Sequence, residues 1–281
     1  MSERFDRVVE IMARLRGEGG CPWDRKQTRE TLKPYLVEEA YEVLDTIETQ
    51  DEAKLKEELG DVLLQVLFHA QIGRERKTFT IEDVLETLAE KLVRRHPHVF
   101  GETTNNPPAH ISTEEVVHRW EEIKRQEKAG QTGNGEAGSA LDGVPKALPA
   151  LLRAYQLQVR AARVGFDWPH DKTGYAQVVS KVHEELREVE EARAEAARSA
   201  TDAAKQRLED EIGDLLFALV NLARLVKVNP EEALRRTANR FAERFIHMEE
   251  AAKRSGRALS EMTLAEMDRL WDEAKASERK S

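Results

Sequence analysis

The feature that most constrains the fold of this chain is a short acidic motif that occurs twice, each time at the start of a long apolar run. Residues 57–70 read EELGDVLLQVLFHA, and residues 210–223 read DEIGDLLFALVNLA. In each copy a Glu and an Asp stand three positions apart, so they share one face of a helix, and a Gly lies between them. The apolar residues that follow predict helices packed against protein. Each carboxylate pair is therefore expected to face protein rather than bulk water.

The two copies belong to a longer internal repeat. Each half begins with an amphipathic helix, continues through a Trp-containing loop, and carries a Glu-rich helix before the E-x-G-D helix. A basic helix follows, and each half closes on a Trp with a Lys four residues later, Trp120 with Lys124 and Trp271 with Lys275. Six features in the same order indicate a duplication.

Helical periodicity dominates the chain, and β-type alternation is scarce. This pattern predicts an all-α fold. Helices are expected over residues 5–15, 36–47, 57–70, 81–95, 146–164, 178–199, 205–226 and 230–254. Residues 127–145 are rich in Gly and small polar side chains, which is the composition of a linker. We therefore predict an N-terminal domain over 1–126, a flexible linker over 127–145 and a C-terminal domain over 146–281.

Composition narrows the classes of function. The net charge of −9 argues against the binding of a nucleic-acid polymer over a broad basic surface. The single cysteine, Cys21, excludes an intramolecular disulfide and a Cys-rich zinc site. No apolar run approaches the roughly 18 residues of a membrane span, and the first residues lack the apolar core of a signal peptide. A cytoplasmic protein without a membrane partner is expected.

Acidic side chains gather on two neighbouring helices in each half. The N-terminal set is Glu38, Glu39, Glu42, Glu58 and Asp61, and the C-terminal set is Glu184, Glu185, Glu188, Glu211 and Asp214. Solvated acidic faces are common in a chain with 53 Asp and Glu residues. Carboxylates beside an apolar run, however, are costly to bury unless a cation neutralises them. Oxygen ligands without Cys or paired His favour Mg²⁺, or Mn²⁺ in its place, over zinc.

Other residues bear on this interpretation. Gly60 and Gly213 stand in mid-helix, where glycine costs about 1 kcal/mol relative to alanine, so we interpret them as points of close approach by another helix or by a ligand. A di-iron bundle would need two Glu-x-x-His motifs, and the chain offers one, from Glu115 to His118. No phosphate-binding glycine loop occurs, so a nucleotide would be held by metal and side chains.

The combination of E-E-x-x-E and E-x-x-D, duplicated, with CPWDRKQT, RRHPHVFG, VGFDW and EIGDLLFALVNLAR, closely resembles the MazG family of nucleoside triphosphate pyrophosphohydrolases. The resemblance covers almost the whole chain apart from the linker. It implies an all-α fold whose helical-bundle domains form homodimers. It also implies Mg²⁺-dependent hydrolysis of NTPs and dNTPs to the monophosphate and pyrophosphate, serving nucleotide-pool sanitation or regulation.

The resemblance also assigns roles residue by residue. In the C-terminal half it implies the metal ligands Glu185, Glu188, Glu211 and Asp214, with Glu184 beside them to orient the attacking water. The implied nucleotide contacts are Lys181, Glu184, Arg240, Arg244, Trp271 and Lys275. In the N-terminal half, Glu38, Glu39, Glu42, Glu58 and Asp61 match the motif of a second metal site.

The halves differ in two respects. Phe68 stands where the C-terminal copy has Asn221, and Glu42 to Glu58 spans 16 positions where Glu188 to Glu211 spans 23. We expect catalysis at the C-terminal site, whereas the N-terminal site is active, narrower in substrate, or regulatory and dimer-forming. Two other classes stay open. One is a binding module whose acidic faces dock a basic partner around a structural metal, and the other is a diphosphohydrolase acting on a different nucleotide.

Overall fold

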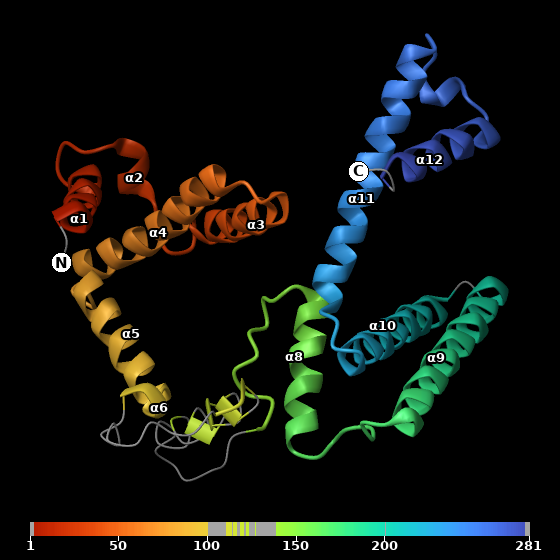
Figure 1. Cartoon of the computed structure of the whole chain (residues 1–281), viewed down its shortest axis with the longest axis horizontal. Helices are drawn as coiled ribbons and strands as arrows, with labels where there is room; N and C mark the ends of the chain where they lie inside the picture. The colour runs from red at the N-terminus through yellow and green to blue at the C-terminus, as the bar shows by residue number, and fades with distance from the viewer. Residues whose placement is uncertain are drawn as a thin grey trace. The chain divides into compact units, whose positions relative to one another are not determined.

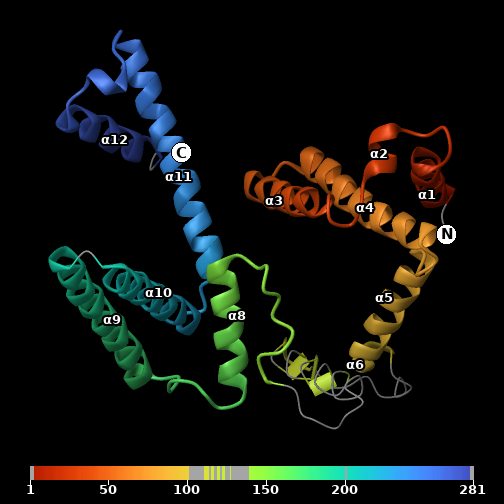
Figure 2. The same cartoon turned by 180° about the vertical axis from the view of Figure 1, so that it is seen from behind.

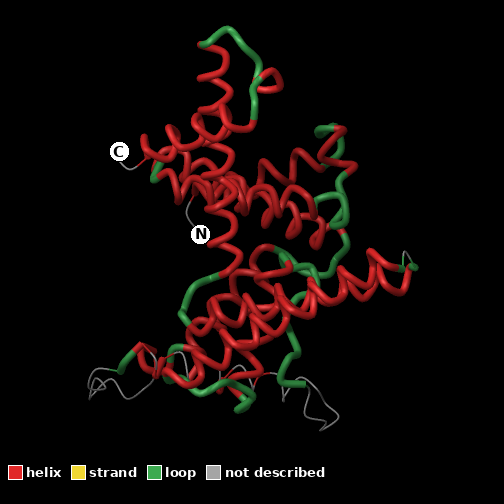
Figure 3. Tube along the Cα trace, turned by 90° about the vertical axis from the view of Figure 1, so that its right-hand side faces the viewer, coloured by secondary structure: helices red, strands yellow, loops and turns green. Residues whose placement is uncertain are grey.

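The computed structural model describes residues 3–100, 139–199 and 201–278, together with residues 111–113, 115–116, 119–120, 122–123 and 127. These residues form helices joined by turns, with no strand among them (Figure 3). The predicted all-α fold is therefore confirmed. Most of the predicted linker, residues 128–138, lies outside the described residues, as do His118 and Lys124. The chain divides into two compact units, Met1–Gly133 and Asn134–Ser281.

The N-terminal unit is built around a long central helix. Its helices are α1 (Glu3–Arg16), α2 (Pro22–Lys26), α3 (Lys33–Thr49), α4 (Glu52–Glu75), α5 (Ile81–Arg95) and α6 (Pro97–Phe100). The α3 and α4 helices form an antiparallel hairpin (Figure 1). The side chain of Asp51 caps α4 by accepting hydrogen bonds from the Ala53 and Lys54 N–H groups, and α4 also packs on α1 and α5. This hairpin carries all five acidic residues of the predicted N-terminal site.

The core of this unit lies where α1, α4 and the start of α5 meet. Its buried members are Met12, Leu32, Leu67, Phe68, Ala70, Ile72 and Ile81. A capping box between Thr80 and Asp83 fixes the start of α5 beside this core. The core therefore holds the C-terminal half of α4 rigidly, while the carboxylates sit towards its N-terminal half.

The C-terminal unit contains two helical hairpins. Its helices are α8 (Ala150–Arg163), α9 (Lys172–Arg198), α10 (Asp202–Leu225), α11 (Pro230–Arg254), the short 3-10 helix η1 (Leu259–Glu261) and α12 (Leu264–Glu278). The α9 and α10 helices pack along each other, and α8 packs on α10 and α11. In Figures 1 and 2 the α12 helix folds back on α11, away from the α9–α10 hairpin.

Caps explain where two of these helices begin. Asp171 accepts hydrogen bonds from the Thr173 and Gly174 N–H groups and starts α9 six residues before the predicted boundary. Asn229 caps α11, with Pro230 at the first helical position, where a missing N–H costs nothing.

Large apolar side chains remain exposed on the C-terminal unit. Its buried apolar residues include Val178, Val220 and several alanines, whereas Ile212, Leu216 and Leu219 form an exposed stripe along α10. Phe241 and Phe245 on α11 are exposed as well. Among the described residues, no helix is long and apolar enough to cross a bilayer.

Candidate functional site

Three carboxylates of the N-terminal unit converge between α3 and α4. Oxygen atoms of Glu39, Glu58 and Asp61 lie within 4.8 Å of one another. Glu39 comes from α3, and the other two stand three residues apart on α4, so the hairpin brings their faces together. The expected juxtaposition of the E-E-x-x-E and E-x-x-D motifs is therefore present in this unit.

The pKa values of this group reflect crowded negative charge. Burial raises the pKa of Glu39 from its usual value, and the charges of Asp61 and Glu42 raise it further. Glu58 is buried, and burial together with the Glu42 carboxylate raises its pKa. Lys54, whose Nζ lies 3.7 Å from Glu58 Oε1, opposes this shift. The group is short of positive charge.

The C-terminal unit builds the corresponding group between α9 and α10. Oxygen atoms of Glu185, Glu188 and Glu211 lie within 4.8 Å of one another. Glu185 is 5% exposed, and Glu188 and Glu211 are half-buried. Burial raises the pKa of Glu188, and the Glu185 and Glu211 charges add to that rise. Both copies therefore gather three carboxylates at the same place in their hairpins.

Cations sit against the C-terminal group from two sides. Lys181 Nζ lies 2.6 Å from Glu185 Oε1 and 3.0 Å from Glu184 Oε1, and these hydrogen bonds raise the pKa of the lysine. Arg207 Nε lies 3.5 Å from Glu211 Oε1, and its guanidinium also pairs with Glu195. The lysine and the arginine thus each neutralise one member of the carboxylate group.

Several predicted ligands lie outside these converging groups. Asp214 is exposed, contrary to the expectation that it faces protein, and it does not join Glu185, Glu188 and Glu211. Glu38 is exposed too, whereas Glu42 approaches Glu58 closely enough to share a hydrogen bond. Helical spacing puts these residues near the right face, but the rotation of each helix decides which oxygen atoms meet.

The two mid-helix glycines are not contact points within their own units. Among the described residues, no neighbouring group lies within 4 Å of where a Cβ at Gly60 or Gly213 would stand. Close approach by another helix is therefore not found within the described part of either unit, and close approach by a ligand stays a prediction. At these positions each helix presents an open surface beside its carboxylates.

The predicted nucleotide contacts form a second cluster on the α11–α12 hairpin. The Arg244 guanidinium stacks over the Trp271 ring with 5.3 Å between its carbon and the ring centroid. Phe241 packs against the same ring at 5.2 Å between centroids. Arg240 donates a hydrogen bond to Thr237, and Lys275 lies 3.7 Å from Asp272. Of the predicted nucleotide contacts, only Lys181 and Glu184 lie beside the carboxylate group.

Asn221 has a structural partner that sequence spacing did not reveal. Its Oδ1 accepts hydrogen bonds from Arg224 at 3.0 and 2.8 Å. Arg224 in turn forms a bidentate ion pair with Asp167 of the loop before α9. Phe68, at the matching place in α4, is a buried core residue with Trp23 against its ring edge. The difference between the halves therefore concerns how each Trp loop is held.

Two basic residues and one ion pair near the candidate site were missed by sequence reasoning. Lys54 and Arg207 each stand four residues before the Glu of the E-x-x-D motif, a spacing that signals an ion pair on a helix. The Arg224–Asp167 pair joins residues 57 positions apart, so no local pattern could have indicated it.

The donor set fits a hard divalent cation. Among the described residues, each converging group offers carboxylate oxygens and no His or Cys, which suits Mg²⁺ or Mn²⁺ better than zinc. The carboxylates are half or fully buried and mutually repelling, a state that a bound cation relieves. No His joins either group, so the described residues offer nothing further to the di-iron alternative.

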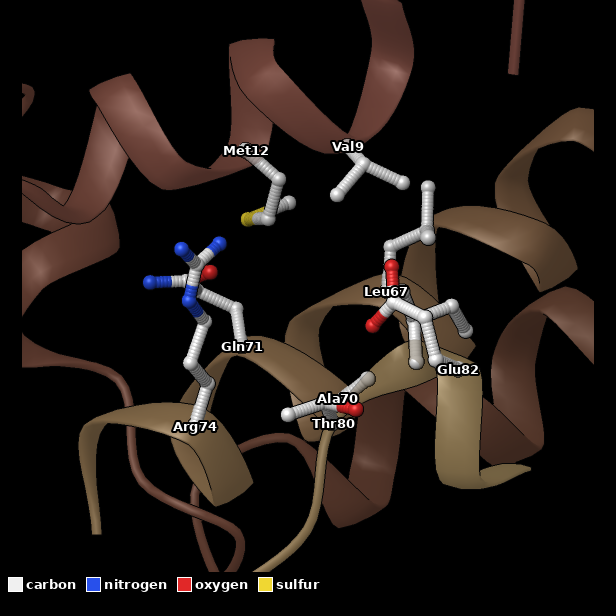
Figure 4. A pocket seen from close by; sticks show the side chains of 9 residues that line it. Val9, Met12, Leu67, Ala70, Gln71, Arg74, Thr80 and Glu82 are labelled. Atoms are coloured by element: carbon white, nitrogen blue, oxygen red, sulfur yellow. The ribbon is translucent and has the colours of Figure 1, made fainter. Parts of the chain in front are cut away.

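A small hollow in the N-terminal unit is separate from these carboxylates. Figure 4 shows it between α1, α4 and the start of α5. Apolar side chains make up part of its lining, and polar side chains at Gln71, Arg74 and Glu82 make up much of the rest. None of the predicted site residues lines it.

The family model and two relatives that match this chain are described as pyrophosphohydrolases of nucleotides. The family model described as the MazG nucleotide pyrophosphohydrolase domain matches residues 27–100 and again residues 174–249. The chain is 46% identical over 274 residues to the nucleoside triphosphate pyrophosphohydrolase/pyrophosphatase MazG of Thermotoga maritima, a match covering 98% of this chain and 96% of that protein. It is 43% identical over 276 residues to the nucleoside triphosphate pyrophosphohydrolase of Escherichia coli, covering 98% of each.

Among solved structures, the crystal structure of a MazG-related protein from Thermotoga maritima is similar at 32% identity. That match covers 44% of this chain and 98% of that chain, with a TM-score of 0.35. The double match of the family model confirms the internal duplication, with one matched segment in each half. The chain therefore belongs to the MazG family of nucleotide pyrophosphohydrolases, enzymes that hydrolyse phosphoric anhydrides, and it carries the family's domain in both halves.

Proposed function

We propose that this protein hydrolyses nucleoside triphosphates and deoxynucleoside triphosphates to the monophosphate and pyrophosphate, with Mg²⁺ as the cofactor. The observation that carries the proposal is the convergence of Glu185, Glu188 and Glu211 within 4.8 Å on two helices of a family domain. Mn²⁺ is the expected substitute, because the same oxygen ligands suit it. The relatives named as nucleoside triphosphate pyrophosphohydrolases support the substrate class.

Glu185, Glu188 and Glu211 would hold the metal, and Asp214 would complete the set by turning inward from its exposed position. A Mg²⁺ ion held by these residues would neutralise charge on the triphosphate and would make a water molecule more acidic. Glu184 orients the attacking water and takes its proton. A bond forms between the water oxygen and the α-phosphorus, the bond from that phosphorus to the bridging oxygen breaks, and pyrophosphate leaves.

Positive and aromatic side chains would bind the rest of the nucleotide. Lys181 lies beside the carboxylates and reaches a phosphate oxygen as a point charge. Arg240, Arg244 and Lys275 offer further phosphate contacts, and Trp271 offers a ring on which a base stacks. These four lie on the α11–α12 hairpin, so closing this cluster onto a bound nucleotide requires the hairpin, or the same hairpin of a second copy, to approach the carboxylates.

The proposal includes a homodimer, which the apolar surface left open on the C-terminal unit supports. Ile212, Leu216 and Leu219 make a continuous exposed stripe on α10, and Phe241 and Phe245 are exposed on α11. Soluble proteins rarely leave such stripes uncovered, and a second copy presents a matching one. Light scattering of the purified full chain measures the mass directly, and a monomer at micromolar concentration contradicts this part of the proposal.

The N-terminal group is proposed as a second Mg²⁺ site, with Glu39, Glu58 and Asp61 as its nearest ligands and Glu38 and Glu42 beside them. It is either active, narrower in substrate, or regulatory. In the cell we assign the protein to the cytoplasm, where it clears aberrant nucleotides or adjusts nucleotide pools.

The decisive test is identification of the products. Each NTP and dNTP is incubated with the full chain and Mg²⁺, and the phosphorus-containing products are separated by chromatography. Monophosphate and pyrophosphate are expected in equal amounts. Diphosphate and orthophosphate as the main products would overturn the proposal. If turnover survives both Glu185→Gln and Asp214→Asn in a folded chain, the C-terminal carboxylates are not catalytic, and Asp61→Asn is tested next. A folded parent chain that binds metal but has no turnover favours the binding module with a structural metal. A panel of other nucleotides tests for a diphosphohydrolase that acts on a different nucleotide.

A further inference from the structure

We propose that Lys181 is an internal counter-ion that occupies the edge of the metal site until Mg²⁺ arrives, and that its displacement couples metal binding to phosphate binding. This inference rests on the proposed function, because it concerns the same carboxylates. The inference is based on one contact: Lys181 Nζ lies 2.6 Å from Glu185 Oε1, and Glu185 is a member of the converging group. A divalent cation held by that group would have an ammonium as its immediate neighbour.

In the metal-free protein, the Lys181 ammonium makes contacts with the carboxylates that a metal cation would otherwise make. Glu185 is buried, and the one basic side chain recorded on it among the described residues is Lys181, which is also 3.0 Å from Glu184. A buried carboxylate is costly without a partner, so the lysine lowers that cost in the metal-free protein. Glu188 and Glu211 then keep oxygen atoms in place beside it.

The Lys181 side chain can also move away from the carboxylates. Its side chain is 41% exposed, in contrast to the 7% of Glu185. Four methylene groups let the ammonium swing by rotation of side-chain bonds while its stem stays on α9. Mg²⁺ repels the ammonium at this distance, and a triphosphate offers new oxygen acceptors nearby. Metal entry therefore frees Lys181 for phosphate, and phosphate binding stabilises the metal-loaded state.

The N-terminal copy provides an internal contrast. Glu39 corresponds to Glu185, and four residues before it the chain has Tyr35 rather than a lysine. The basic residue recorded near that group among the described residues is Lys54, 3.7 Å from Glu58. The N-terminal group thus lacks the displaceable ammonium on its Glu-rich helix, and the coupling we infer belongs to the C-terminal site.

The test is the affinity for Mg²⁺ with and without a non-hydrolysable nucleotide. Titration calorimetry is done at low ionic strength on full-length protein carrying Glu39→Gln and Glu58→Gln, so that the C-terminal site is read alone. The analogue has a methylene bridge between the α- and β-phosphorus. In the presence of Lys181 the analogue should tighten Mg²⁺ binding strongly. Lys181→Met should tighten Mg²⁺ binding without nucleotide by about 5-fold or more, and should reduce the tightening by the analogue.

Lys205→Met is the matched control, because Lys205 lies on α10 against Asp202, outside the carboxylate groups. It should change neither quantity. Lys181→Gln keeps a hydrogen-bond donor and should shift both quantities in the same direction as Lys181→Met. It provides the same test if Lys181→Met does not fold. In the parent protein, Mg²⁺ should also increase acylation of Lys181 by an amine-reactive label, measured by mass spectrometry.

The possible results distinguish a failure of this inference from a failure of the proposed function. Unchanged Mg²⁺ affinity in Lys181→Met overturns the inference alone. Tightening by the same factor with and without the analogue also overturns it, because Lys181 is then a fixed charge rather than a displaced one. Failure of the parent protein to bind Mg²⁺ at all overturns the metal site of the proposed function and this inference with it.

Discussion

Arg224 near the end of α10 forms a bidentate ion pair with Asp167 in the loop before α9, and both side chains are about nine-tenths buried. The pair fastens the Trp168 loop to the helix that carries Glu211. Burial alone would raise the pKa of Asp167, but the hydrogen bonds from Arg224 and the Trp168 N–H outweigh it and lower the pKa. This contact is a buried polar link between that loop and α10.

Arg224→Met should therefore destabilise the C-terminal unit. Removing one partner of a buried pair leaves an uncompensated charge, which costs about 3 kcal/mol or more. Asp167→Asn together with Arg224→Met should recover part of that loss, because neither charge is then stranded. Urea unfolding of the full chain measures both values, and equal stability of Arg224→Met and the parent contradicts the role given to the pair.

Asn221 should matter for stability more than for turnover. Its side chain accepts two hydrogen bonds from the Arg224 guanidinium, so Asn221→Ala should cost about 2 kcal/mol, as for a lost hydrogen bond to a charged group. Initial rates well below the melting transition should stay within about 3-fold of the parent, since less than 0.7 kcal/mol of barrier is then involved. A large fall in turnover at unchanged stability would place Asn221 on the substrate instead.

Glu39→Gln should raise the thermal midpoint of the metal-free protein at neutral pH. The raised pKa of Glu39 means that its charged form is held unfavourably by burial and by Asp61. Because the folded-state pKa lies above the unfolded value, the advantage of Gln is complete above the raised pKa. It declines as pH falls through that pKa, and disappears below the ordinary value of 4.5.

The measurement is a pair of thermal melts, parent and Glu39→Gln, across that pH range in the presence of a chelator. Added Mg²⁺ should raise the midpoint of the parent more than that of the variant. Glu86→Gln is a suitable control, since Glu86 is exposed on α5 and outside the converging group. A lower midpoint for Glu39→Gln than for the parent at pH 7 would show that the carboxylate is stabilising as it stands.

Much of the fold was predictable because its signals are local. The α5 and α11 helices have the predicted bounds, since Thr80 with Asp83 and Asn229 with Pro230 mark their starts. The start of α9 was missed because D-K-T-G resembles a turn, whereas Asp171 serves as a cap. The all-α class and the duplication followed from periodicity and motif order, and both are confirmed.

The candidate site was predictable only in part. Motif spacing identified the two helices and the face of each, and Glu39, Glu58 and Asp61 do meet. Spacing did not indicate that Asp214 is exposed or that Gly213 faces open space, because both depend on how one helix is rotated against another. Contacts between distant residues, such as Arg224 with Asp167, carry no local signal at all.

The central claim is that the C-terminal carboxylates carry the Mg²⁺-dependent hydrolysis. The most direct measurement is the initial rate of pyrophosphate release from one NTP under saturating Mg²⁺, for the parent, Glu185→Gln and the matched Glu39→Gln. Glu185→Gln should lose about 100-fold or more, as expected when a group essential to stabilising the transition state is removed, and Glu39→Gln should keep most of the rate. A fully active Glu185→Gln, or an inactive Glu39→Gln beside it, would contradict the account.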